Sequence, residues 1–155
     1  MTELERSGPD PHAITRHIVE TFPGVDIVAN DFGTFFSLDP ETHWPNFATL
    51  VTNDSNDAAS NLLRPGVFRL NIGVNRGTFE RLVGSDVDPD YTALDRMLPH
   101  PVYARQLWLA ILNPSAQTFE DVVKPLLAEA YQRLAAQQAR RAASSAKPGP
   151  ARHDT

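Results

Sequence analysis

Residues 67–74, VFRLNIGV, carry the clearest strand pattern in the chain. Apolar side chains stand at every second position: Phe68, Leu70, Ile72 and Val74. Successive side chains of a β-strand point to opposite faces of the sheet, so this period of two predicts a strand with one apolar face. Because Arg69 and Asn71 occupy positions between them, we expect the second face of the sheet to be open to water or only partly covered.

Helices and further strands surround this stretch on both sides. Asp10 followed by Pro11 predicts an N-cap and a proline in the first turn of a helix that runs to about residue 22. The other expected elements are a hairpin over 25–39, a strand over 45–54, a short helix between Asn75 and Gly84, and a buried strand over 107–112.

A helix with a wide apolar stripe closes the pattern. The stripe consists of Phe119, Val122, Val123, Leu126, Leu127, Ala130, Tyr131 and Leu134. Thr118 and Asp121 predict a capping box at its start. Pro125 lacks an amide donor, which predicts a kink or a delayed start near Lys124. The protein is expected to be a monomer or a homodimer, the dimer being favoured if the stripe is wider than one sheet can cover.

The order helix, strands, helix, strand, helix predicts an α+β fold, a two-layer sandwich of a mainly antiparallel sheet flanked by helices. The 155 residues suffice for one domain with one core. We expect a flexible N-terminus over 1–10, a single α+β domain over 11–135 and a disordered tail over 136–155, because the tail has almost no apolar side chains to bury.

Composition disfavours several classes of function. The absence of cysteine excludes disulfides, thiolate catalysis and cysteine-ligated zinc. No stretch approaches the roughly 18 apolar residues of a membrane span, and the first residues lack a signal-peptide layout, so we expect a cytoplasmic protein without membrane contact. Residues 1–135 contain 10 Lys+Arg against 18 Asp+Glu, an acidic balance that disfavours nucleic acid as a partner.

Several motifs together resemble a bacterial family of unknown function over about residues 12–134. They are PGVDI, DFGTFFSLDP, FATLVTND, RPGVFRLNIGV, TFERLVG and LPHPVYARQLWLAILNP. The PGV turn, the strand ending NIGV, the tryptophan strand and the helix ending EAYQRL are more remotely similar to MmcQ/YjbR-like proteins, whose small sandwich is akin to CyaY and secretion chaperones. This resemblance implies a mixed sheet flanked by helices and no reaction.

The same resemblance raises two further points. DNA binding has been suggested for the remoter relatives, and the tail offers Arg140, Arg141, Lys147 and Arg152, but the acidic body lacks the basic surface that such binding needs. Weak DNA binding is therefore a minor alternative. In the closer family a small polar residue often precedes the tryptophan, where this chain has Leu107, so a pocket lined by that position would be altered here.

His100 is the first candidate for chemistry. It stands between Pro99 and Pro101, which restrain the local backbone and hold the imidazole in a defined direction. That suits a general base, and it equally suits a structural bend. No serine, cysteine or carboxylate motif accompanies it, which favours the bend. The alternative is a small-molecule enzyme that uses His100 with a carboxylate brought near in space.

A ligand-binding surface is the second candidate. If the second face of the sheet is open, a cation, amides and aromatic walls meet on it: Arg69, Asn71, His100, Tyr103, Trp108 and Trp44. The competing interpretation is that Arg69 pairs with a carboxylate and both tryptophans are core. We therefore expect a small binding or interaction domain without evident catalysis, whose ligand or partner the sequence does not name.

Metal and cofactor sites are not expected. His17 and Glu20 lie three residues apart on the first helix, which offers only two ligands and is more typical of an ion pair at the helix edge. The DPETHW segment, residues 39–44, has the spacing of a solvated loop. Residues 73–77, GVNRG, match neither the dinucleotide fingerprint nor a Walker motif.

Overall fold

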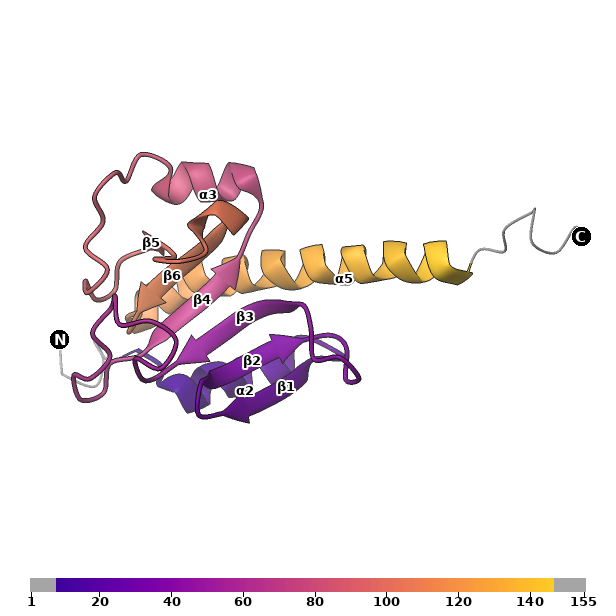
Figure 1. Ribbon diagram of the computed structural model, residues 1–155, viewed down its shortest axis with the longest axis horizontal. Coiled ribbons are helices and arrows are strands. Elements are labelled where there is room, and N and C mark those ends of the chain that lie inside the picture. Colours follow the sequence, from indigo (N-terminus) through magenta and orange to yellow (C-terminus); the bar gives the residue numbers. More distant parts are fainter. Residues whose placement is uncertain (1–7, 147–155) are drawn as a thin grey trace, which may run out of the picture.

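A six-stranded sheet forms the centre of the molecule, with the strand order β1-β2-β3-β4-β6-β5 (Figure 1). The computed structural model describes residues 8–146. All five strand pairs are antiparallel, which confirms the α+β prediction. The strands are β1 (Asp26–Asn30), β2 (Gly33–Ser37), β3 (Asn46–Val51), β4 (Arg69–Gly73), β5 (Leu98–Pro99) and β6 (Trp108–Leu112).

The sheet is not the mixed one that the MmcQ/YjbR resemblance implies. Within the described residues, parallel pairing is confined to one isolated bridge between Leu94 and Leu112. Each long strand is instead followed by an antiparallel neighbour. The first hairpin shows why, because only Asp31 and Phe32 separate β1 from β2, and a turn this short reverses the chain direction.

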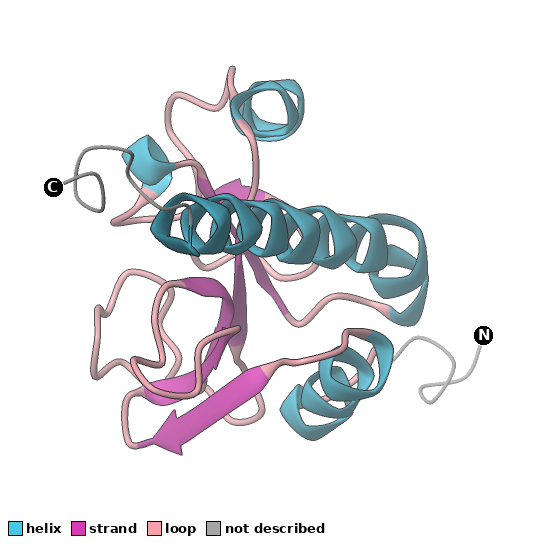
Figure 2. Ribbon diagram, turned by 90° about the vertical axis from the view of Figure 1, so that its right-hand side faces the viewer, coloured by secondary structure: helices cyan, strands magenta, loops and turns pink. Residues whose placement is uncertain are grey.

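Helices cover one face of the sheet. They are α2 (Pro11–Thr21), α3 (Arg76–Val83), the short α4 (Ala116–Thr118), the π-helical η2 (Phe119–Val123) and α5 (Lys124–Ala146), with a 3-10 turn η1 (Ala104–Gln106) before β6. Leu70 and Ile72 of β4 are fully buried in the core that α2 and α5 complete, as their alternation predicts (Figures 1 and 2). The caps predicted at Asp10 and Asn75 are confirmed, since each side chain accepts a hydrogen bond from the backbone N–H three residues on.

The start of the last helix corrects one prediction. Thr118 and Asp121 do not form the capping box, because Ser115 is the cap and its Oγ accepts from the backbone N–H of Thr118 at 3.1 Å. Helical structure therefore begins three residues earlier. The π-helical turn η2 then ends at Val123, and its C-cap is Lys124, whose N–H donates to the carbonyl of Phe119; Pro125 follows. The sequence predicts a kink or a delayed start near Lys124; the structure instead has an earlier start, and the irregularity at this place is the π-helical turn.

The helix α5 continues well past residue 135, where the sequence predicts a disordered tail. Residues 136–146 are helical, and α5 extends beyond the end of the sheet (Figure 1). Alanine, glutamine and arginine dominate this part, and all three propagate a helix readily once its first half is packed. Gln138 also donates to the carbonyl of Leu38 at 2.8 Å. Residues 1–7 and 147–155, the remainder of the two expected flexible ends, lie outside the described residues.

The second face of β4 is covered, so the prediction of an open or partly covered face is wrong at this strand. Arg69 and Asn71 are each only 2% exposed. The segment 52–66 crosses this face, and a second, smaller apolar cluster lies beneath it, formed by Val51, Leu62, Leu98 and Leu112. Polar residues alternate with apolar ones on β4 because polar partners, and not water, face them.

Candidate functional site

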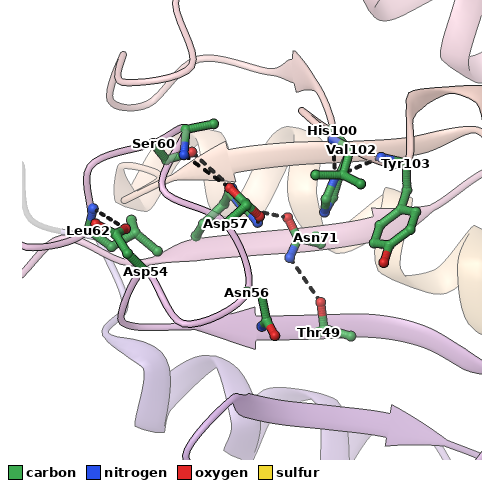
Figure 3. Close-up of polar contacts among 12 residues, drawn as sticks. Thr49, Asp54, Asn56, Asp57, Ser60, Leu62, Asn71, His100, Val102 and Tyr103 are labelled. Carbon is green, nitrogen blue, oxygen red and sulfur yellow. Dashed lines mark hydrogen bonds and ion pairs between the residues drawn. The ribbon is translucent and has the colours of Figure 1, made fainter.

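Arg69 lies at the centre of a buried polar cluster on the second face. Its Nη1 and Nη2 donate to the two carboxylate oxygens of Asp57 at 3.0 and 2.7 Å, a bidentate pair. Nη1 also donates to Ser60 Oγ at 3.0 Å, and Nε donates to Asn71 Oδ1 at 3.0 Å. Asn71 Nδ2 in turn donates to Thr49 Oγ1 at 2.9 Å (Figure 3). We call these five residues the Arg69 anchor.

The Arg69 anchor holds the 52–66 segment on the sheet. Asp57 and Ser60 belong to that segment, whereas Arg69 and Asn71 belong to β4. The hydrogen bonds from Arg69 hold the pKa of the Asp57 carboxyl below its usual range. All three guanidinium nitrogens donate to protein groups, so Arg69 pairs with a carboxylate, as the competing interpretation predicts. The other part of that interpretation, that both tryptophans are core, is wrong for Trp44, which is 67% exposed.

His100 forms a tight bend beside the Arg69 anchor. Its Nδ1 accepts from the backbone N–H groups of Val102 and Tyr103, both at 3.0 Å (Figure 3). The backbone N–H of His100 donates to the carbonyl of Trp108 at 2.9 Å. His100 as a whole is 4% exposed. Burial, and secondarily the nearby Arg69 charge, lowers the pKa of His100 to about 4. The imidazole is therefore neutral at pH 7, with Nδ1 as an acceptor.

The enzyme alternative requires a carboxylate hydrogen-bonded to His100. Within the described residues, the hydrogen bonds of His100 go to backbone groups alone. Asp57 is near enough for its charge to act on the ring, but both of its oxygens accept from Arg69. The geometry thus places His100 in the structural bend.

Leu107 follows that bend with an unusual backbone conformation. Its φ of 68° lies in the left-handed region, which costs a non-glycine residue about 1–2 kcal/mol and which asparagine tolerates best after glycine. We expect the free energy of unfolding of Leu107→Asn to be about 1 kcal/mol higher than that of Leu107→Ala. Both variants lose the same apolar side chain, and asparagine tolerates this φ better than alanine does. Urea titration of the two variants measures the difference; equal stabilities would contradict it.

The aromatic candidates lie at two separate places. The indole of Trp108 packs on Gly73 of β4, where an added Cβ would come within 3.3 Å of the ring. Tyr103 lies against His100, with ring centroids 5.0 Å apart, and more than half of its surface is exposed. Trp44 lies apart from this group, just before β3, and is 67% exposed. Five of the six predicted residues therefore share one region, and Trp44 does not.

Trp44 borders a pocket of about 240 Å³ between the 38–45 segment and the second half of α5. Its lining consists of Leu38, Asp39, Trp44, Pro45, Leu134, Gln137, Gln138, Arg141 and Ala142. Four of these residues, 137, 138, 141 and 142, belong to the stretch predicted to be disordered. Sequence analysis therefore could identify Trp44 but not the wall that faces it.

The turn that carries Trp44 is held by its own hydrogen bonds. Asp39 accepts from the N–H of Glu41 at 2.9 Å and from the hydroxyl of Thr42 at 2.8 Å, and these bonds lower the pKa of Asp39. The Thr42 hydroxyl also lies 2.9 Å from the Trp44 carbonyl. On the outer side, His43 Nδ1 lies 2.8 Å from a carboxylate oxygen of Asp26 in β1. The position of the Trp44 backbone is thus fixed by local contacts.

The lining of the pocket carries one negative side chain, Asp39, and one positive side chain, Arg141. Asp39 uses its oxygens within its own turn, and Gln138 donates to the Leu38 carbonyl. Within residues 8–146, no ion pair is found for Arg141, although it lines the pocket. The guanidinium of Arg141 and the amide of Gln137 are the polar groups available to a ligand.

A second hollow of about 450 Å³ lies at the other end of the molecule, where α2 begins. Its polar side chains serve the fold. Asp10 caps α2, Asp95 accepts from the N–H of Ser115, and Asn113 joins the N–H of Phe68 to the carbonyl of Gly66. The polar side chains of this hollow are therefore less available to a ligand than those of the pocket beside Trp44.

The fold and both sites lie within one known family. A family model described as "Family of unknown function (DUF6194)" matches residues 9–143. The chain belongs to the DUF6194 family. The matched DUF6194 segment includes the Asp10 cap, the Arg69 anchor and both walls of the pocket beside Trp44. Comparison with curated proteins and with solved structures finds no match. The MmcQ/YjbR resemblance stays a prediction.

Metal ligands do not cluster in the part of this DUF6194 chain that the structure describes. No group of three histidine, aspartate or glutamate side chains there is placed to hold an ion. His17 contacts Thr21 through Nδ1 at 3.2 Å, and it does not form the predicted ion pair with Glu20. The described helices also include none that is both long and apolar enough to cross a membrane.

Proposed function

We propose that this DUF6194 chain is a binding domain without catalysis, and that it takes a small organic carboxylate in the pocket beside Trp44. The observation that carries the proposal is the 67% exposure of Trp44 next to the Arg141 guanidinium. Tryptophan and arginine are enriched among the residues that dominate binding energy at protein–protein interfaces, where burial by the partner removes water from them. A volume of about 240 Å³ suits a ligand smaller than the drug-sized molecules that fill pockets of about 300–1,000 Å³.

The lining supports an amphipathic ligand. Leu38 and Leu134 supply an apolar floor, and the Trp44 indole supplies a flat wall for a planar group. Arg141 then pairs with the carboxylate through two parallel N–H donors, and Gln137 adds an amide. A neutral analogue of the same shape would keep the apolar contacts and lose the charged pair.

The same residues give little support to catalysis. Asp39 is the carboxylate in the pocket, and its hydrogen bonds within the turn favour the ionised, weakly basic form. His100 is not among the residues that line the pocket. A cytoplasmic location and the absence of nucleic acid among the partners remain part of this proposal, on the grounds of the charge and hydropathy of the sequence.

Calorimetric titration with benzoate tests the proposal, with benzyl alcohol as the uncharged analogue. We expect Arg141→Gln to weaken benzoate binding by about 10-fold or more, since a hydrogen-bonded charge contributes about 1.5–3 kcal/mol. We expect Trp44→Ala to weaken both probes. Arg140→Gln is the matched control, because Arg140 is adjacent on α5 but does not line the pocket.

Two results would count against the proposal. One is equal affinity of the wild-type protein for benzoate and for benzyl alcohol, which would remove the role of the charge. The other is the same loss of benzoate affinity in Arg140→Gln as in Arg141→Gln, which would indicate nonspecific attraction to a basic helix.

A further inference from the structure

The strand β1 leaves one long edge of the sheet unpaired. It is the terminal strand in the sheet order, and no described segment runs along its outer side (Figures 1 and 2). Its sequence DIVAN contains neither lysine nor proline, and its pairing with β2 has no bulge within β1. Proteins protect sheet edges with these devices, and an edge without them is a template for another strand. Ile27, the second residue of β1, is 39% exposed.

The hydrogen-bonding groups on this edge follow from the register of the hairpin. The pair Asn30 and Gly33 closes a two-residue turn, and in such hairpins the closing pair exchanges both backbone hydrogen bonds. The bonded positions alternate from there, so Val28 and Asp26 also bond to β2. The N–H and C=O groups of Ile27 and Ala29 therefore point outward.

We propose that the outer edge of β1 binds β1 of a second copy of this chain. The two strands run antiparallel about a twofold axis at Val28. Ile27 then exchanges two hydrogen bonds with Ala29 of the partner subunit, and the symmetric pair adds two more. The two six-stranded sheets become one continuous sheet.

The strand is self-complementary in this register, which is why the partner is a second copy. Asp26 lies opposite Asn30 of the partner subunit, so each carboxylate faces an amide and like charges do not meet. The hairpin turn of one copy, with its half-exposed Phe32, lies toward the Pro23-Gly24 turn of the other. Gly24 leaves open space there, since even an added Cβ would have no neighbour within 4 Å.

The test is the mass of the full chain by analytical ultracentrifugation, from about 10 μM to about 500 μM. The wild-type protein is expected to move from 17.1 kDa toward twice that mass as its concentration rises. Ala29→Pro removes an outward N–H that β2 does not use, and Ile27→Lys places a charge on the edge. Both variants are expected to stay monomeric. Val87→Lys, at an exposed loop residue, is the matched control and is expected to dimerise.

Each outcome decides the proposal. Amide hydrogen exchange at Ile27 and Ala29 should slow by about 10-fold or more at dimeric concentrations in the wild-type protein, and it should not slow in Ile27→Lys. A wild-type protein that stays at 17.1 kDa up to the highest concentration overturns the proposal. Dimers of a folded Ile27→Lys variant also overturn it, because they place the interface elsewhere. If Ala29→Pro does not fold, Ile27→Lys alone still decides the question.

Discussion

The Arg69→Met variant is expected to have a free energy of unfolding about 3–5 kcal/mol lower than that of the wild-type protein. Removing one member of a buried ion pair leaves the other charge without its partner, and that cost exceeds the value of the contact itself. Here the charge left behind is Asp57 of the 52–66 segment, and Ser60 and Asn71 also lose their shared donor. Urea unfolding followed by circular dichroism measures the change.

The pair Arg96 and Asp86 provides the control for this prediction. Its N···O distance is 3.7 Å and Arg96 is mostly exposed, so Arg96→Met is expected to change stability by less than about 1 kcal/mol. Asp57→Asn should resemble Arg69→Met, and the double variant should cost less than the sum of the two. Similar losses in Arg69→Met and Arg96→Met, or additive losses in the double variant, would show that the anchor is not a coupled unit.

Acid is expected to destabilise the protein through His100. In the folded state its pKa is about 4, against about 6.5 in an unfolded chain, so the unfolded state binds more protons between these values. The contribution of the neutral ring to stability is therefore complete above pH 6.5 and is lost as the pH falls toward 4. The loss is about 3 kcal/mol by pH 4, at about 1.4 kcal/mol for each unit of pKa difference.

A His100→Asn variant isolates this effect from other groups. The pKa of His17 is also lowered by burial, and it acts in the same pH range, but it is common to both proteins. The lowered pKa of Asp57 acts in a different range, below about 3.8, where protonation of that carboxyl removes stability. Urea unfolding at several pH values between 7.5 and 4 should give a steeper loss in the wild-type protein than in the variant. Parallel curves would contradict the assignment to His100.

Local signals in the sequence predict most of the elements. The turn between Asn30 and Gly33 places β1 beside β2, and the alternation around Leu70 places one face of β4 in the core. Asp10 and Asn75 mark two helix starts correctly, because an N-cap is formed within four residues. At the last helix two hydroxyl residues, Ser115 and Thr118, compete for the same role, and the sequence does not distinguish which one caps.

Contacts between distant segments are the part that the sequence does not predict. An arginine on a strand has the same pattern whether water or a carboxylate faces it, and Asp57 is one of many acidic residues that are candidates for that role. The pocket beside Trp44 depends on a helix that continues past residue 135 and on a turn about a hundred residues earlier. Neither segment has a sequence motif that predicts its contact with the other.

The two faces of the sheet are held by different kinds of force, so temperature and acidity act on them separately. Leu70 and Ile72 face an apolar layer whose stabilisation weakens on cooling, because apolar hydration is driven by entropy near room temperature. On the other face Arg69 binds Asp57 of the covering segment, and the contributions of Asp57 and of His100 to stability depend on their protonation. Cold therefore weakens the apolar layer beneath the helices, whereas mild acid first charges His100 and acts on its bend, before the lower pKa of Asp57 is reached.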